Sequence, residues 1–307
     1  MVSPAPVTIA VAGATGDLGL RIVQALRREG ASVTAIVRPG TDQARLGPLT
    51  VLGARVVEAG PGRPGSWQAA CAGAACVVSA LNGLSATVID AQTALLEGAV
   101  RAGVPRFIPS DFSIDYAKTA PGGNRNLDLR RAFQARLDAA SIQATSVLNG
   151  AFMELLDGQA PLILHRPRWV LYWGSADQIL DFTTEDDTAA FTARAALDPT
   201  TPRWLRIAGD SLSARDLADA ASAARGRRYR TLRAGGLGSL GLMIRVARTL
   251  APGRGAVFPP WQGMQYLRDM FEGRARLTPL DNDRYPGLRW TRVRTFLTQT
   301  AGAHGQS

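Results

Sequence analysis

Runs of apolar, mostly β-branched residues alternate with amphipathic runs over the first 150 residues of the chain. Short apolar runs are typical of strands buried on both faces, and longer amphipathic runs are typical of helices. The alternation predicts an α/β fold with a doubly wound parallel sheet. The predicted strands are Val7–Val11, Ala31–Val37, Arg55–Glu58, Cys76–Leu81, Arg106–Pro109 and Thr145–Leu148, and the clearest helices are Leu20–Arg28, Ile89–Ala102 and Leu129–Ala140.

The pattern loosens after Phe152, where prolines mark turns, and helices are next predicted at Glu185–Leu197 and Ala214–Ala224. A length of 307 residues suits a nucleotide-binding domain with a smaller companion. We therefore expect a Rossmann-type domain over residues 1–152, rejoined by segments within 181–210, and a smaller substrate-binding lobe over residues 153–307.

Three glycines follow the first predicted strand at three-residue spacing, at Gly13, Gly16 and Gly19. In such a loop the first glycine permits a tight turn, the second lets the backbone approach a pyrophosphate, and the third lets the helix pack close to the strand. Glycine turns are common, so the inference of a dinucleotide site depends on the strand and the helix that flank this turn. Its predicted residues are Gly13, Ala14, Thr15, Gly16, Asp17, Leu18 and Gly19.

The residue that ends the second predicted strand indicates which dinucleotide binds. A site specific for NAD places an acidic residue there to accept hydrogen bonds from the ribose hydroxyls, whereas this chain has Arg38. A guanidinium can pair with a 2′-phosphate in bidentate fashion, which favours NADP(H). Arg45, at the start of the next helical pattern, offers a second contact. In the alternative interpretation, both arginines are solvated surface residues.

The topology predicts further ligand contacts where the parallel strands end, because their carboxyl ends share one edge of the sheet. Beyond the glycine loop and Arg38, the corresponding loops begin at Leu81–Asn82, Ser110–Phe112 and Asn149–Phe152.

The chain contains few histidines and cysteines, which limits the kinds of metal and catalytic sites that it can form. Because His165 and His304 are the only histidines, we expect no histidine-based metal site and no histidine triad. Cys71 and Cys76 are expected as small buried thiols in a reduced compartment rather than as a disulfide. No charged leader precedes the first strand and no apolar run reaches membrane-spanning length, so we expect a soluble cytoplasmic protein without a membrane partner.

The net charge of +10 arises in the last quarter of the chain, where residues 225–294 hold 15 arginines and four acidic residues. A solvated face or an oligomer contact, including a homodimer, is the ordinary explanation. Steering of an anionic substrate and contact with nucleic acid are alternatives. Nucleic acid is the less favoured of these, because no recognised nucleic-acid module accompanies the arginines.

A second glycine triad, at Gly236, Gly238 and Gly241, also satisfies the spacing of a nucleotide loop. The run before it is rich in arginine and makes a poor buried strand, and no βαβ unit follows. We therefore interpret this triad as the entry to a helix of the second lobe.

Four segments together resemble the NmrA-like branch of the atypical short-chain dehydrogenases, which includes the isoflavone and phenylcoumaran benzylic ether reductases. They are GATGDLG at Gly13–Gly19, VRPG around Arg38, AGVPRFIPSDFSID at Ala102–Asp115 and TSVLNGAF at Thr145–Phe152, within a likeness over about the first 220 residues. The resemblance implies NADP(H) contacts from the glycine loop and Arg38. It adds Ser79, Ala80, Leu81, Asn82, Ser110, Asp111, Phe112, Asn149, Gly150 and Phe152. Phe112 and Phe152 would flank the nicotinamide, with ordinary packing as the alternative.

The resemblance also implies where catalysis occurs. The family's reductases use a lysine on the helix before the sixth strand, and that position is Arg130 here. Arginine stays protonated near neutral pH and cannot donate a proton, but it can polarise a carbonyl or hold an anionic substrate. The only lysine, Lys118, is a second candidate, with a solvated loop lysine as the alternative. The family's acidic residue after the third strand is replaced by Ala59–Pro61.

Two functions follow as hypotheses. The first is an NADPH-dependent oxidoreductase that transfers hydride to a small carbonyl, quinone or enone-type substrate, aromatic or anionic in character. The alternative is a non-catalytic NADP(H)-binding redox sensor or regulatory scaffold of the NmrA type, which Arg130 at the lysine position and the basic last quarter favour.

Overall fold

A six-stranded parallel sheet forms the centre of the first of two compact units. The computed structural model describes residues 6–253 and 255–304, and its sheet has the order β3-β2-β1-β4-β5-β6. The strands are β1 (Thr8–Ala12), β2 (Ser32–Val37), β3 (Arg55–Glu58), β4 (Cys76–Ser79), β5 (Arg106–Ile108) and β6 (Gln143–Ala144). The chain reverses direction across the sheet after β3, and this order confirms the predicted doubly wound Rossmann-type fold.

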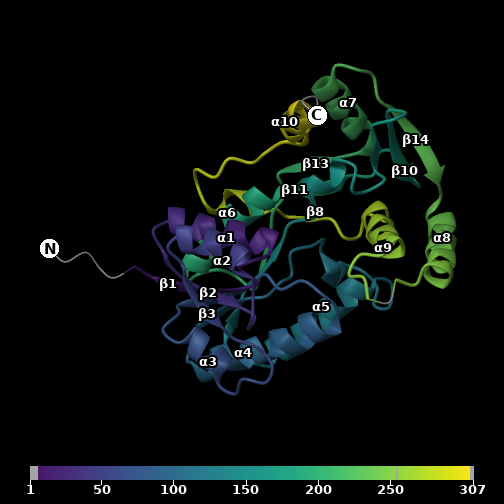
Figure 1. Ribbon diagram of the computed structural model, residues 1–307. Coiled ribbons are helices and arrows are strands. Elements are labelled where there is room, and N and C mark those ends of the chain that lie inside the picture. Colours follow the sequence, from purple (N-terminus) through teal and green to yellow (C-terminus); the bar gives the residue numbers. More distant parts are fainter. Residues whose placement is uncertain (1–5, 254, 305–307) are drawn as a thin grey trace. The chain divides into compact units, whose positions relative to one another are not determined.

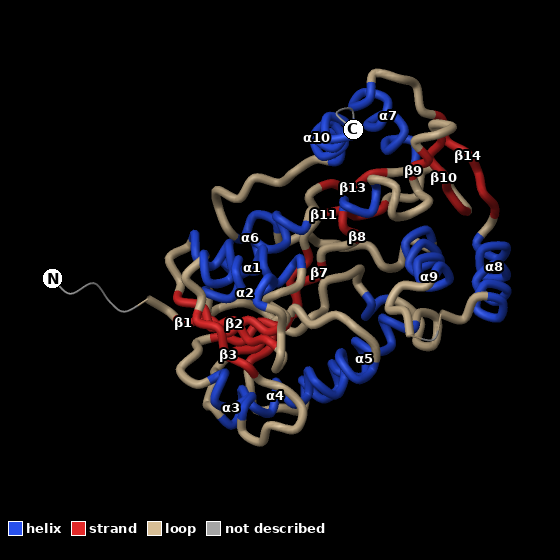
Figure 2. Tube along the Cα trace, viewed as in Figure 1, coloured by secondary structure: helices blue, strands red, loops and turns tan. Residues whose placement is uncertain are grey.

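Helices cover both faces of this sheet. Figure 1 shows α1 and α2 with α6 on one face and α3, α4 and α5 on the other, and Figure 2 shows the sheet between them. Their bounds are α1 (Asp17–Arg28), α2 (Gln43–Val51), α3 (Ser66–Cys71), α4 (Gln92–Arg101), α5 (Arg125–Asp138) and α6 (Glu185–Leu197), with a π-helical turn at Ala86–Ala91 leading into α4. Phe107 of β5 packs on Phe133 of α5 with ring centroids 6.3 Å apart, within a core that also holds Leu95 and Leu137.

A buried arginine attaches residues 188–205 to the first unit. The Arg106 guanidinium on β5 is 5% exposed and donates to the carbonyls of Ala195 and Ala196 at 2.8 and 2.9 Å and to Thr201 Oγ at 2.6 Å. These carbonyls lie in the last turn of α6, where the helix dipole favours a cation.

The second unit contains two small sheets and most of the later helices. The sheets are β14-β10-β9 and β13-β11-β8. A separate pair, β7 with β12, has most of its residues in unit 1. The strand bounds are β7 (Ser146–Leu148), β8 (Ala151–Phe152), β9 (Ile163–Leu164), β10 (Trp169–Trp173), β11 (Leu180–Thr183), β12 (Trp204–Arg206), β13 (Asp210–Leu212) and β14 (Arg230–Gly235), and the helices are α7 (Ala214–Arg225), α8 (Leu237–Leu250), α9 (Pro260–Phe271) and α10 (Val293–His304).

The two units interleave along the sequence. Unit 1 comprises residues 1–112, 129–147 and 188–205, and unit 2 comprises residues 113–128, 148–187 and 206–307. The division therefore assigns 188–205 to the same unit as residues 6–112. It differs from the expected boundary at residue 152 in assigning 113–128 to unit 2, where Asn124 donates to Asp269 Oδ2 at 2.9 Å.

Three local predictions differ from the structure. The helix expected from Leu129 begins at Arg125, because buried Asn126 and Leu127 already belong to its first turn. The strand expected at Thr145–Leu148 corresponds to β7, which pairs with β12, whereas the sixth strand of the large sheet is β6 at Gln143–Ala144, just before it. The arginine-rich run before the second glycine triad does form a strand, β14, because an exposed edge strand tolerates charges that a buried strand does not.

None of the helices in the described ranges combines the length and apolar character needed to cross a lipid bilayer.

Both cysteines are buried free thiols, as predicted, and burial raises the pKa of Cys71 and of Cys76 to about 12. At pH 8 about one thiol in ten thousand is then ionised. We expect iodoacetamide at pH 8 to label neither cysteine in the folded protein and both in urea, as measured by mass spectrometry. An Ala72→Cys variant, whose added thiol is exposed, is the positive control. Equal labelling rates for Cys71 and this control would contradict the prediction.

Candidate functional site

The glycine loop between β1 and α1 is a tight turn in contact with the end of β4. Gly13 has φ +78°, a left-handed conformation that favours glycine, and a Cβ there would lie 2.6 Å from the carbonyl oxygen of Ala80. The Gly16 N–H donates to Gly13 O at 2.9 Å and closes the turn. Ala14 is fully buried beneath it. The backbone, rather than side chains, therefore shapes this loop.

Helix α1 begins directly after the loop with its first backbone amides uncapped by any side chain. Gly16 occupies the N-cap position in an extended conformation. Gly19 is buried, and a Cβ on it would collide with the carbonyl oxygen of Gly13. Asp17 is exposed and pairs with Arg21 at 3.1 Å. Free amides at the positive end of a helix dipole, approached closely by a Cβ-free backbone, form an anion cradle that fits a pyrophosphate.

Arg38 and Arg45 both belong to unit 1 and come from neighbouring segments. Arg38 directly follows β2 and is exposed, and no hydrogen bond or ion pair joins its guanidinium to another described residue. Arg45 on α2 donates through Nη2 to the carbonyl of Thr15 in the glycine loop at 3.1 Å. Arg45 therefore lies at the predicted loop, and Arg38 is available to a ligand phosphate.

A carboxylate also lies near the end of β2. Glu58 ends β3 opposite Val37, accepts the Gly40 N–H at 3.2 Å and pairs with Arg63 at 2.7 Å. The Gly40 hydrogen bond, then the Arg63 hydrogen bond, hold the pKa of Glu58 below its usual value. Glu58 is thus ionised near neutral pH, but its charge is already balanced by Arg63.

The loops after β4 and β5 lie at the carboxyl edge of the same sheet. Ser79 is fully buried, and its Oγ finds no hydrogen-bond partner among the described residues. Ala80, Leu81 and Asn82 follow it, with Asn82 exposed. Ser110, Asp111 and Phe112 follow β5 and are all nearly buried, and Asp111 Oδ2 accepts the Ser146 hydroxyl at 2.6 Å.

Sequence reasoning missed Gln92, the first residue of α4. It is 1% exposed, and its Oε1 accepts the Ser110 N–H at 2.9 Å while its Nε2 donates to Val88 O at 3.0 Å. Gln92 therefore holds the loop after β5. The available signal was a polar residue at a position where the helical pattern calls for an apolar one.

The third predicted segment belongs to unit 2. The N–H groups of Asn149 and Gly150 both donate to Ser113 O, at 3.0 and 3.1 Å. Asn149 is fully buried, yet its side-chain oxygen and nitrogen have no hydrogen-bond partner in the described part of the chain. An amide in this state normally serves a ligand or an ordered water. Gly150 has φ +72°, and Phe152 ends β8 half-buried.

Lys118 is engaged in contacts within unit 2. Its Nζ donates to the carbonyls of Arg276 and Thr278 at 2.9 and 3.1 Å and lies 3.2 Å from Asp115 Oδ2. Asp115 is fully buried and also pairs with Arg206 at 2.8 Å. These contacts make Lys118 a link between a loop and the chain near residue 277, so its candidacy as a proton donor rests on the prediction alone.

Arg130 lies in the second turn of α5, on the part of that helix that belongs to unit 1. The residue is half-buried. Helices that connect strands of a parallel sheet begin near its carboxyl edge, where ligands bind. This placement suits a charge that interacts with a substrate.

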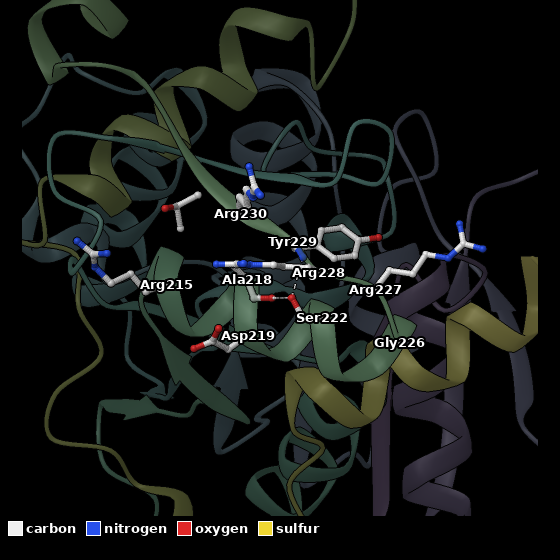
Figure 3. Close-up of a pocket in the computed structure, with 10 residues that line it drawn as sticks. Arg215, Ala218, Asp219, Ser222, Gly226, Arg227, Arg228, Tyr229 and Arg230 are labelled. Carbon is white, nitrogen blue, oxygen red and sulfur yellow. Dashed lines mark hydrogen bonds between the residues drawn. The ribbon is translucent and has the colours of Figure 1, made fainter.

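The hollow drawn in Figure 3 lies elsewhere, between α7 and the start of β14. It measures about 660 Å³, and its lining includes Arg215, Arg227, Arg228, Arg230 and one carboxylate, Asp219. It contains none of the predicted cofactor residues. The hollow lies in unit 2, on residues 215–231, and does not belong to the predicted nucleotide site.

Comparison with known proteins agrees with the fold described above. Pinoresinol reductase 1 of Arabidopsis thaliana is 31% identical over 207 residues, an alignment covering 63% of this chain and 65% of that protein's length. The structure of AtPrR2 with NADP+ and (+)pinoresinol superposes with a TM-score of 0.79 at 24% identity, over 97% of this chain and 99% of that chain.

The NADPH-dependent quinone oxidoreductase QOR2 of Escherichia coli superposes with a TM-score of 0.70 at 20% identity, over 95% of this chain and 99% of that chain. At these identities the two solved structures show a shared fold. The model of the NmrA-like family matches residues 6–235, three quarters of the chain and all the predicted cofactor loops, and this chain therefore belongs to the NmrA-like family.

Proposed function

We propose that the protein binds NADP(H) at the carboxyl edge of the unit 1 sheet and uses it to reduce a small quinone or enone. The proposal rests on the amino terminus of α1, which has no side-chain cap and follows the glycine loop of Gly13, Gly16 and Gly19. Arg38 is available beside it. The buried Ser79 hydroxyl, which lacks a partner among the described residues, supports it. Two similar structures also support it: AtPrR2 was solved with NADP+, and QOR2 is an NADPH-dependent quinone oxidoreductase.

Arg38 is assigned the 2′-phosphate that distinguishes NADPH from NADH. Hydrogen bonds to charged groups contribute about 1.5–3 kcal/mol, so Arg38→Ala is expected to weaken NADPH binding by about 10–100-fold and leave NADH binding unchanged. A fluorescence titration of both nucleotides measures this. Arg28→Ala, which removes another exposed arginine of unit 1, is the matched control. Equal losses for both nucleotides, or no binding by the wild type, would remove the assignment.

The choice of a quinone or enone follows from Arg130. When bound, the reduced nicotinamide supplies a hydride to the substrate. A permanently charged guanidinium then stabilises the oxygen on which negative charge develops, but it does not deliver a proton. The monoanion formed when a quinone accepts hydride is phenol-like, with a pKa of about 10, so water can protonate it without a catalytic acid. An alkoxide formed from an isolated ketone is far more basic and benefits from such an acid.

Arg130→Lys tests this reasoning. With a simple quinone we expect the NADPH oxidation rate to stay within about threefold of wild type. With an aryl ketone we expect at least about a tenfold gain, because lysine can donate a proton and general acids contribute about 10²–10⁴-fold. Arg136→Lys, an exposed substitution later on the same helix, is the control. A loss of quinone activity with no gain on the ketone would show that Arg130 does not act in this way.

The alternative is that the protein binds NADP(H) without turnover and acts as a redox sensor or regulatory scaffold. The arginine at the family's lysine position is the observation that favours it. NADPH binding without oxidation across a panel of quinones, enones and aryl ketones would support this function. It should then be accompanied by a nucleotide-dependent change in oligomeric state or in partner binding.

A further inference from the structure

Residues 220–268 of unit 2 form a segment of 49 residues with nine arginines and no aspartate or glutamate. Most surface arginines elsewhere in the chain have carboxylates nearby in the sequence. Within this segment Arg230, Arg233 and Arg245 are exposed, and none of the three forms an ion pair with a described residue. Arg225 and Arg268 pair with Asp157 and Asp269, so the unbalanced positive charge of the segment lies at the three exposed arginines.

Helix α8, in the middle of this segment, is apolar on two opposite sides. Leu240 and Ile244 are buried, and α8 packs on α9. The other side carries Leu242, Met243, Val246 and Leu250, which are 54%, 43%, 47% and 78% exposed; we call these four residues the α8 face. Residues four apart share one side of a helix, so three of them form a continuous stripe. In Figure 1 no other element of unit 2 lies beside α8 on the side away from α9.

A further exposed aromatic side chain follows in the loop between α8 and α9. Phe258 is 58% exposed, and hydrogen bonds hold the backbone of the two residues before it. Arg125 donates to the carbonyls of Val257 and Ala256 at 2.6 and 3.2 Å, and Asn126 Nδ2 donates to Val257 O at 3.2 Å. Phe258 is thus exposed on a loop that hydrogen bonds hold in place.

Contacts with α9 also hold helix α8 in place. The Trp261 ring of α9 lies beneath two guanidiniums, that of Arg125 at 4.8 Å and that of Arg248 of α8 at 5.3 Å from its centroid. Trp261 Nε1 also donates to Pro252 O at 3.1 Å, just after α8 ends. The exposed apolar side chains therefore belong to a fixed surface.

A second copy of the chain is a poor occupant of this surface. A symmetric dimer formed through the α8 face would bring Arg245 of each copy toward the same arginine of the other. No carboxylate in the segment could balance them, so the pairing would be opposed by like charges.

We propose that the α8 face docks on the surface of a membrane that contains anionic lipids. An amphipathic helix with exposed leucines and flanking arginines is suited to lie in the plane of the interface, its apolar side chains at the acyl boundary and its guanidiniums at the lipid phosphates. Such a helix needs no spanning length. The proposal departs from our expectation of no membrane partner, which considered only membrane-spanning runs, and it does not depend on the proposed reductase activity.

Co-sedimentation of the full chain with vesicles tests the docking. We expect binding to vesicles that contain phosphatidylglycerol, little binding to pure phosphatidylcholine, and weakening as salt rises. Leu250→Asp should weaken binding at least about tenfold, because it removes an apolar side chain from the interface. Arg245→Glu should weaken it by about fivefold to tenfold. The matched controls are Val51→Asp, 88% exposed on α2, and Arg28→Glu on α1; both should bind as wild type does.

Four outcomes would overturn the proposal. The first is no binding to anionic vesicles at low salt, and the second is equal losses in the test and control variants. The third is a concentration-dependent dimer in solution that Leu250→Asp converts to a monomer, which would assign the α8 face to a second copy. The fourth is binding to duplex DNA, lost in Arg245→Glu, with vesicle binding unaffected by Leu250→Asp. All substituted positions are exposed, and thermal unfolding verifies that each variant is folded.

Discussion

Gly19→Ala is expected to weaken NADPH binding by more than about 100-fold and to destabilise unit 1 by about 1–3 kcal/mol. The added Cβ collides with the carbonyl oxygen of Gly13, a backbone atom that cannot move without opening the turn. Opening the turn misplaces the backbone amides that we propose bind the pyrophosphate, each contributing about 1.5–3 kcal/mol to binding a charged group. Isothermal titration with NADPH and urea unfolding measure the two effects.

The matched control is Gly47→Ala. Gly47 lies inside α2 without a positive φ, and a Cβ there meets no atom within 4 Å. Alanine is the better helix former by about 1 kcal/mol, so this variant should be as stable as wild type or slightly more so, with unchanged NADPH affinity. If Gly19→Ala bound NADPH as tightly as Gly47→Ala does, the pyrophosphate could not lie at this turn.

Asp115→Ala is expected to destabilise the protein by about 3–5 kcal/mol, because it leaves two cations without their buried partner. Asp115 is fully buried, and its Oδ2 is 2.8 Å from Arg206 Nε and 3.2 Å from Lys118 Nζ. Lys118 would retain its contacts to the carbonyls of Arg276 and Thr278, but without a countercharge. Urea unfolding measures the loss of stability.

A surface ion pair in the same unit supplies the comparison for this second prediction. Asp177 pairs with Arg215 at 2.7 Å, but both side chains are more than 60% exposed. Exposed pairs contribute about 0–1 kcal/mol, so Asp177→Ala should change stability little. A similarly small change in Asp115→Ala would mean that the Asp115 pairs are solvated, and it would reopen Lys118 as a mobile proton donor.

Prediction from the sequence was most successful where a local pattern is sufficient. The β1 run, the glycine spacing and the amphipathic α1 run are contiguous, and the backbone geometry of Gly13 and Gly19 follows from residues within one turn of them. The position of Arg38 directly after β2 likewise needed only the local pattern, and its role at a 2′-phosphate stays a prediction. The unit to which Asn149 belongs could not be seen locally, because pairing with distant strands decides it.

The roles of Lys118 and Gln92 could not be predicted from the sequence. Lys118 is held by carbonyls 158 and 160 positions away, and no neighbouring residue signals them. Gln92 holds the Ser110 amide across 18 positions. Such contacts depend on which distant segments the fold brings together, and a single sequence contains no direct signal for those pairings.

The sequence by itself determined the class of fold, the glycine turn and the charge available at Arg38, because strand and helix periodicity and backbone sterics act over a few residues. It also determined the absence of carboxylates over residues 220–268. Only the tertiary structure decided that Lys118 is bound to carbonyls, that Arg45 reaches Thr15, and that α8 buries one apolar side and exposes the other. Burial of a side chain is a property of what packs against it, and what packs against α8 is brought there by the rest of the chain.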